Sequence, residues 1–292
     1  MTTEITRVGV LGCGLMGAGI AEVAARAGVD VVVVESDDDA VDRGRRRLTA
    51  SLDRAVVAGR LAEHERDRAL GKLLFAPDME AFTDCQLIVE AVPELMALKL
   101  EAFAAIDRIV KDPEAILASN TSSIPIMRLA SVTERPEQVV GLHFFNPVPV
   151  LGLVELVSCL LTGQETVRRA ETFAEEVLHK RVIRSQDRAG FIVNALLIPY
   201  LLSAIRMLES GFATADDIDT GMVEGCAHPM GPLRLADLVG LDTLLHVAHS
   251  LYEEFKEPLH APPPMLLRMV EAGLLGRKSG RGFFHYAGER AA

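Results

Sequence analysis

The first two thirds of the chain alternate between short apolar runs and longer amphipathic stretches. Val8 to Leu11 is an apolar run, a glycine-rich turn and helical spacing through Ala27 follow it, and Val31 to Val34 is a second run. This is the pattern of a β-α-β unit with buried parallel strands. Five further strands are predicted at Leu87 to Val89, Ile116 to Ala118, Val139 to Leu142, Gly152 to Ser158 and Arg181 to Arg184. The alternation predicts an α/β fold, a Rossmann-type doubly wound, mainly parallel sheet.

Helical patterns complete the outline and divide the chain in two. A helical insertion is predicted at about 38–72, interrupted by the turn Ala58-Gly59-Arg60, and further helices are predicted at Leu95 to Val110 and Glu165 to His179. From Gly190 onward strand patterns vanish, and helices are predicted at 190–211, 215–225, 234–255 and 262–273. We therefore predict a first domain over 1–187 and an all-α domain over 188–292, with the boundary in the polar segment Ser185 to Ala189.

Charge and cysteine usage exclude several classes of protein. The 292 residues carry 30 Lys plus Arg against 41 Asp plus Glu, a net charge of -11 that repels a phosphate backbone, so we expect no nucleic-acid partner. Four cysteines stand far apart without a C-x-x-C pair, which argues against a disulfide framework and a zinc site. His246 and His249 have no nearby ligand set, so no metal is expected.

No export or membrane signal is expected. Met1 to Thr6 lacks the basic residues of a signal peptide. Phe191 to Leu208 is long enough to span a bilayer, but it contains Asn194, Pro199 and Arg206, so a buried core helix is the better interpretation. These features predict a cytoplasmic protein with no membrane partner.

A glycine motif follows the first predicted strand and opens a helix. Gly12, Gly14 and Gly17 fit G-x-G-x-x-G, with Leu15 and Met16 inside it. Glu35 ends the second strand 23 positions after Gly12, where a carboxylate can accept hydrogen bonds from an adenosine ribose and repel a 2′-phosphate. The motif predicts NAD rather than NADP. The alternatives are a glycine-rich turn without a ligand and, for the neighbouring Asp37 to Asp39, a solvated helix cap.

A histidine and a glutamate form a possible acid/base pair. His143 follows a predicted strand where open α/β sheets bind their ligands, and Glu155 lies twelve residues later. A histidine held by a carboxylate can remove the hydroxyl proton when hydride leaves an alcohol carbon. The alternative is a hydrogen-bonded structural histidine, because spacing cannot prove that Glu155 reaches it.

Nearly the whole chain resembles the 3-hydroxyacyl-CoA dehydrogenase family in its single-function form. Seven motifs in order carry the likeness: Gly12 to Gly19, Val89 to Glu94, Ser119 to Ser123, His143 to Leu156, Gly190 to Asn194, His228 to Pro232 and Gly276 to Phe283. The resemblance implies NAD-dependent, reversible oxidation of an L-3-hydroxyacyl-CoA, such as 3-hydroxybutyryl-CoA, and dimerisation through the helical domain. Two alternatives are a dehydrogenase of a free hydroxy acid, as in the gulonate dehydrogenase and lambda-crystallin branch, and a non-catalytic NAD-binding protein.

The resemblance also implies roles for individual residues. His143 would be the catalytic base and Glu155 its partner. The remaining matches are Ser122 and Asn194 as contacts of the acyl group, Asn146 as a contact of cofactor and substrate, Glu94, Lys99 and Lys278 at the nicotinamide half of NAD, and Ser51 as a CoA contact. Ala58 departs from the family, in which a CoA-binding lysine can stand there.

Each of these matches has a structural alternative. Ser122 could cap a helix, Glu94 could begin one, and Lys99 could be solvated. Asn194, on an apolar helical run, could instead make an interdomain hydrogen bond. Four arginines would ordinarily form a solvated helix face, but we hypothesise that one or more contact the CoA 3′-phosphate: Arg43, Arg45, Arg46 and Arg47.

Overall fold

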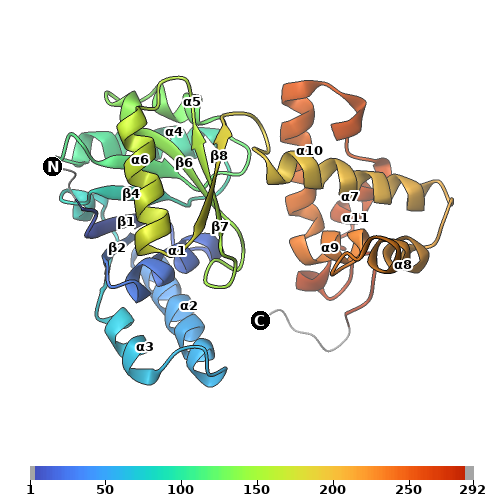
Figure 1. Ribbon diagram of the computed structural model, residues 1–292, viewed down its shortest axis with the longest axis horizontal. Helices are drawn as coiled ribbons and strands as arrows, with labels where there is room; N and C mark the ends of the chain where they lie inside the picture. The colour runs from blue at the N-terminus through green and yellow to red at the C-terminus, as the bar shows by residue number, and fades with distance from the viewer. Residues whose placement is uncertain (1–3, 287–292) are drawn as a thin grey trace. The chain divides into compact units, whose positions relative to one another are not determined.

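The computed structural model describes residues 4–286, which form two compact units that divide between Asp187 and Arg188 (Figure 1). The first unit contains an eight-stranded sheet in the order β3-β2-β1-β4-β5-β6-β7-β8. Its strands are β1 (Arg7–Leu11), β2 (Asp30–Val34), β3 (Leu73–Ala76), β4 (Leu87–Glu90), β5 (Ile116–Ser119), β6 (Val139–Phe144), β7 (Leu153–Ser158) and β8 (Arg181–Gln186). Only the β6–β7 pair is antiparallel among these strands. The predicted fold class is confirmed.

The sequence pattern did not predict the edge strand β3. Its four residues are only partly buried or exposed, because a strand at the edge of a sheet packs on one neighbour only. A run this short carries a weak periodic signal. The central strands, by contrast, are buried along nearly their full length, which is why they are apolar throughout.

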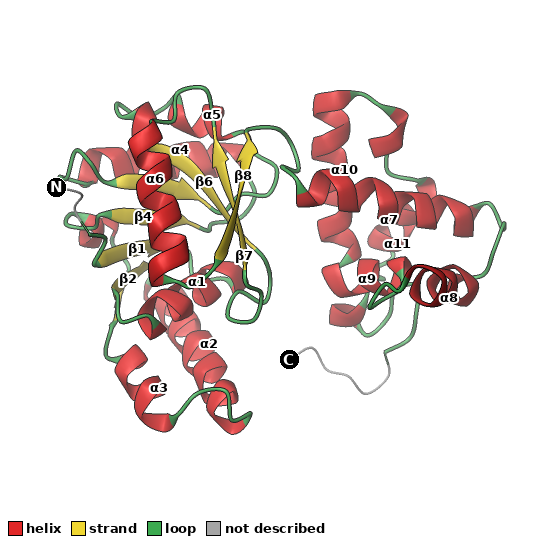
Figure 2. Cartoon of the chain, in the orientation of Figure 1, coloured by secondary structure: helices red, strands yellow, loops and turns green. Residues whose placement is uncertain are grey.

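Helices cover both faces of this sheet (Figure 2). α1 and α6 pack against one face, and α4 and α5 against the other, as a doubly wound sheet requires. The helices of this unit are α1 (Leu15–Arg26), α2 (Asp38–Val57), α3 (Glu63–Leu70), α4 (Met96–Ile109), α5 (Ile126–Ala130) and α6 (Gln164–Thr172). Asp37 caps α2, because its side chain accepts a hydrogen bond from the Ala40 N–H at 2.7 Å. The cap predicted among the three aspartates is confirmed for Asp37.

The second unit is helical over its described residues, apart from isolated bridges near its end. Its helices are α7 (Val193–Glu209), α8 (Ala215–Cys226), α9 (Pro232–Val239), α10 (Leu241–Phe255) and α11 (Pro264–Glu271). The single helix predicted over 234–255 is wrong. Gly240 adopts a φ of +98°, outside the helical region, and separates α9 from α10. A glycine tolerates this conformation at little cost, so it ends the first helix.

The apolar stretch from Phe191 to Leu208 forms most of α7, and its prediction as a core helix is confirmed. Leu201, Leu202 and Ile205 are fully buried in the core of the helical unit. Within residues 4–286, no helix combines the length and the hydropathy needed to cross a bilayer.

Candidate active site at the carboxyl edge of the sheet

The strand register brings the candidate residues of the first unit to one edge of the sheet. Leu11 pairs with Val34 on one side and with Glu90 on the other, and Glu90 pairs with Ser119. The residues that follow these strand ends therefore emerge side by side. The strand order reverses between β1 and β4, and ligands of open α/β sheets bind at this switch point.

The glycine loop after β1 has the shape that a pyrophosphate requires. Gly12 has a φ of +88°, and a Cβ there would lie 2.9 Å from the Ala91 carbonyl oxygen. A Cβ on Gly14 would meet no atom within 4 Å, so the backbone is open to an approaching group. α1 begins at Leu15 without a side-chain cap, which leaves its first N–H groups and positive dipole end for an anion. The loop therefore fits a dinucleotide.

Alanine at Gly17 is expected to disrupt this loop. A Cβ there would lie 1.8 Å from the Gly12 carbonyl oxygen, and no side-chain rotation can relieve a clash with backbone. We expect a loss of about 1–3 kcal/mol or more in unfolding free energy, measured by urea denaturation, and a weaker affinity for NAD by calorimetry. Gly14→Ala is the matched control and should keep the stability of the parent. A Gly17→Ala protein with unchanged stability and affinity would contradict this account.

Glu35 reaches the glycine loop from the end of β2. Its Oε1 accepts a hydrogen bond from the Cys13 N–H at 2.5 Å, and its side chain is partly exposed. Burial and the Glu35 charge raise the pKa of the Cys13 thiol to about 12, so the thiol stays neutral at physiological pH. The carboxylate thus lies beside the loop, where it can accept hydrogen bonds from a ribose.

His143 and Glu155 face each other across β6 and β7. They are paired in the antiparallel register, and His143 Nδ1 lies 2.7 Å from Glu155 Oε2. Glu155 is fully buried and His143 is 6% exposed. The twelve-residue spacing alone could not establish this contact. The contact depends on the antiparallel register of β6 and β7, which the connecting residues 145–152 allow. A buried carboxylate acceptor favours the tautomer with the proton on Nδ1, which makes Nε2 the basic nitrogen.

The loop between these strands is held by a buried lysine that the sequence pattern did not reveal. Lys180 Nζ donates hydrogen bonds to the carbonyl oxygens of Val148 and Leu151, both at 2.7 Å. Burial lowers the pKa of Lys180. Asn146 lies at the start of this loop and is exposed. The sequence showed only that Lys180 precedes a predicted strand, and a lysine in such a position is ordinarily solvated.

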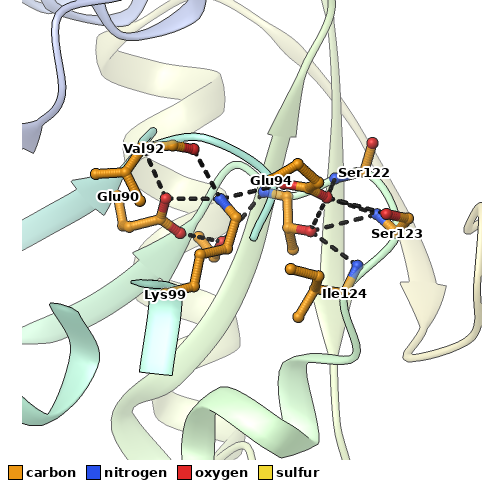
Figure 3. A network of polar contacts seen from close by, with 9 residues as sticks. Glu90, Val92, Glu94, Lys99, Ser122, Ser123 and Ile124 are labelled. Atoms are coloured by element: carbon orange, nitrogen blue, oxygen red, sulfur yellow. Dashed lines mark hydrogen bonds and ion pairs between the residues drawn. The ribbon is translucent and has the colours of Figure 1, made fainter. Parts of the chain in front are cut away.

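A buried charge network lies beneath the β4 and β5 loops (Figure 3). Lys99 Nζ lies 2.6 Å from Glu90 Oε1 and 3.2 Å from Glu94 Oε2, and it donates to the Val92 carbonyl oxygen at 3.2 Å. Lys99 is 1% exposed and Glu90 is fully buried, so the alternative of a solvated Lys99 is wrong. Sequence reasoning missed Glu90, although an acidic residue ending an apolar strand was a visible signal.

Glu94 joins this network to the loop after β5. Its Oε1 accepts hydrogen bonds from the Thr121 hydroxyl and from the N–H groups of Ser122 and Ser123 (Figure 3). Burial alone would raise the pKa of Glu94, but the Lys99 charge and these hydrogen bonds lower it below its ordinary value. The stability that Glu94 contributes is therefore present above its ordinary pKa and lost as the pH falls through the lowered one.

Ser122 does not cap the following helix, so that alternative is wrong. α5 begins at Ile126, and Asp187 accepts hydrogen bonds from the N–H groups of Ile126 and Met127, each at 2.8 Å. Figure 3 shows the Ser122 side chain turned away from the network. Within the described part of the chain, the hydroxyl of Ser122 makes no hydrogen bond. This hydroxyl is therefore available to a ligand.

The remaining candidates lie elsewhere on the two units. Asn194 lies in the first turn of α7 and is partly exposed, and Lys278 forms an ion pair with Asp242 at 2.6 Å. Both belong to the helical unit. Ser51 lies on α2 of the first unit, and Ala58 is exposed at the end of that helix. The structure thus brings Glu94 to Ser122 and places Asn194, Lys278 and Ser51 on separate elements.

A doubly wound sheet whose glycine loop is open to a pyrophosphate is the architecture of a dinucleotide-binding protein. Residues 7–188 match the 3-hydroxyacyl-CoA dehydrogenase NAD binding domain, and residues 190–286 match the C-terminal domain of the same family. The chain therefore belongs to the 3-hydroxyacyl-CoA dehydrogenase family, and it uses NAD.

Individual relatives resemble the chain over almost its full length. It is 61% identical to the 3-hydroxybutyryl-CoA dehydrogenase of Mycobacterium tuberculosis, over 98% of this chain and 100% of that protein. The crystal structure of M. tuberculosis FadB2 matches with a TM-score of 0.97 and 61% identity, covering 98% of this chain and 100% of that one. The (S)-3-hydroxybutyryl-CoA dehydrogenase PaaH1 of Ralstonia eutropha matches with a TM-score of 0.91 and 42% identity, over 97% and 100%.

Proposed function

We propose that this enzyme oxidises short-chain L-3-hydroxyacyl-CoA thioesters, 3-hydroxybutyryl-CoA foremost, to 3-ketoacyl-CoA with NAD, and that it runs in both directions. The 2.7 Å contact between His143 and Glu155 carries the proposal, because it supplies a held base at the ligand edge of a dinucleotide-binding sheet. The names of relatives that are 61% and 42% identical support the hydroxybutyryl thioester as substrate.

The acid/base step is assigned to this pair. NAD accepts the hydride from C3 when it is bound. His143 Nε2 removes the proton of the 3-hydroxyl group as the hydride leaves, and the ring becomes an imidazolium. Glu155 is fully buried and hydrogen-bonded to Nδ1. Its carboxylate stabilises the imidazolium more strongly than a solvent-exposed carboxylate would, because water screens the attraction less in the interior. In the reverse direction the imidazolium returns the proton to the forming alkoxide, so both directions use the same two residues.

The cofactor is assigned to the carboxyl edge on both sides of the strand reversal. Gly12, Gly14 and Gly17, with Leu15 and Met16, would hold the pyrophosphate at the start of α1, and Glu35 would accept the ribose hydroxyl groups. The nicotinamide half would then extend toward β4 and β5. There we place Glu94, Ser122 and Asn146, together with Lys278 of the helical unit. Lys99 is buried, so it would act on this half of the cofactor through Glu94.

The acyl-CoA is assigned to polar groups on three elements. The Ser122 hydroxyl and the Asn194 amide would bind the acyl group at its 3-oxygen and thioester end, and Ser51 on α2 would contact the CoA. Arg45 lies over the Phe75 ring, 4.6 Å from its centroid, and Arg47 bonds the Cys13 carbonyl oxygen. Arg43 and Arg46 are exposed as well, and the four arginines together are the candidates for the CoA 3′-phosphate.

The helical unit is assigned to dimerisation. Two of its large apolar side chains are exposed, Leu196 at 73% and Phe212 at 79%, and a second copy would cover them in the proposed dimer. Sedimentation velocity should report a dimer. The cysteines of the described residues are free, which fits a reducing compartment, and we propose a cytoplasmic enzyme.

A kcat/KM series over C4 to C16 L-3-hydroxyacyl-CoA thioesters, with NAD and with NADP, tests the proposed reaction. We expect the highest kcat/KM at C4 and a clear preference for NAD. L-gulonate is included as a free hydroxy acid. Faster oxidation of L-gulonate would replace the thioester with a free acid as substrate. A protein that binds NAD by calorimetry but forms no NADH from any of these compounds would be a non-catalytic relative.

A further inference from the structure

One backbone residue of the glycine loop is held between two side chains of opposite charge. Cys13 donates its N–H to Glu35 Oε1 at 2.5 Å, and its carbonyl oxygen accepts a hydrogen bond from Arg47 Nη1 at 2.6 Å. The carboxylate comes from the end of β2 and the guanidinium from α2. The Glu35 carboxylate and the Arg47 guanidinium therefore both contact the loop at Cys13, one at its N–H and the other at its carbonyl oxygen.

Close packing of α2 against the loop explains why Arg47 reaches it. A Cβ on Gly44 would lie 2.7 Å from Cys13 Cβ, so the helix touches the loop with no room for a side chain at that position. Arg47 lies three residues later and therefore on the same face of the helix. Arg45 points to another surface, since its guanidinium lies over the Phe75 ring. The position of Arg47 is thus set by the fold.

The two side chains have opposite consequences for the adenosine ribose. A carboxylate accepts hydrogen bonds from the 2′- and 3′-hydroxyl groups and repels a 2′-phosphate, whereas an arginine near the same ribose accommodates that phosphate. A guanidinium also retains several N–H donors after one of them is bonded, and its planar fork matches phosphate oxygens. Arg47 is exposed enough to reach a ligand.

We propose that Arg47 is a specificity-determining residue, a 2′-phosphate site that the Glu35 carboxylate keeps closed. The preference for NAD then depends on one negative charge, and removal of that charge opens the enzyme to NADP. This inference rests on the role proposed above for Glu35. It adds that the opposing cation is already in place, so that no new residue is needed for the change of cofactor.

The test measures binding of adenosine 2′,5′-bisphosphate and of 5′-AMP to the full-length protein by calorimetry. Glu35→Gln removes the charge and keeps an acceptor for the Cys13 N–H, so the loop should retain its shape. We expect this variant to bind the bisphosphate about 10-fold more tightly than the parent, as one added charge-assisted phosphate contact would give. Adding Arg47→Gln should abolish most of that gain and leave 5′-AMP binding within about threefold.

The control is Glu35→Gln with Arg54→Gln, which removes an exposed arginine seven residues further along α2. It should keep the gain, and thermal melts of all variants check that they are folded. Failure of Glu35→Gln to gain affinity for the bisphosphate would overturn the proposal. The proposal would also be overturned if Glu35→Gln gained the same affinity for the bisphosphate with and without Arg47. The same holds if Arg54→Gln removed as much of that gain as Arg47→Gln. The change in 5′-AMP affinity from the parent to Glu35→Gln tests the role of Glu35 at the ribose, separately from Arg47.

Discussion

Alanine in place of His143 is expected to lower kcat by about 10²–10⁴-fold, the usual contribution of a positioned general base. The affinity for NAD should stay within about threefold of the parent, because the loop that holds the pyrophosphate lies on β1 and α1 and not on β6. Initial rates with 3-hydroxybutyryl-CoA give kcat, and calorimetry with NAD gives the affinity. A variant that retains near-parental kcat would remove His143 from the mechanism.

Glu155→Gln separates the chemical role from a merely structural one. It keeps a hydrogen-bond acceptor at 2.7 Å from Nδ1 but removes the negative charge that stabilises the imidazolium. We expect a smaller loss of kcat than for His143→Ala and a shift of the kcat against pH profile toward lower pH, since the histidine becomes less basic. An unchanged profile with an intact fold would show that the Glu155 charge does not act on His143.

Methionine in place of Lys99 is expected to give the largest loss of stability. The substitution leaves Glu90 charged and fully buried without its cation, and breaking such a buried pair typically costs about 3–5 kcal/mol. Urea denaturation of the protein without NAD measures the change in unfolding free energy. The same variant should bind NAD more weakly, because Glu94 loses the ammonium group that lies 3.2 Å from its Oε2.

Two companion variants test the cause of that loss. Glu90→Gln combined with Lys99→Met should recover part of the stability, since no unpaired charge remains buried. Lys72→Met removes an exposed ion pair with Asp30 and should cost less than about 1 kcal/mol. A loss from Lys99→Met as small as that from Lys72→Met would show that the buried network does not stabilise the fold.

The hydrophobic pattern alone was enough to predict most of the strands and helices. Strands buried on both faces are apolar along their length, so β1, β2 and β4 to β6 were visible as short runs, and the absence of such runs after Gly190 indicated the helical unit. The pattern failed where burial is partial or where one residue changes the backbone. The edge strand β3 packs on one side only, and Gly240 splits a continuous helical pattern through its φ of +98°.

Some features of the candidate site could likewise be predicted from the sequence, and others could not. The glycine motif and Glu35 could be identified from the chain because a tight turn, a close backbone approach and a carboxylate at a strand end are local requirements. The buried state of Lys99, its partner Glu90 and the clamp of Lys180 on the loop after β6 could not. A charged residue is ordinarily solvated, and it is buried only where the folded chain places polar partners around it.

The order of residues along this chain was sufficient to specify the alternation of strands and helices, the nucleotide loop and the residue types of an acid/base pair. Whether His143 meets Glu155, and whether Arg47 and Glu35 share the Cys13 peptide groups, depended on strand register and helix packing. The physical reason is that periodicity reports the burial of each residue in turn, whereas a contact between side chains requires two distant segments to be fixed in one geometry.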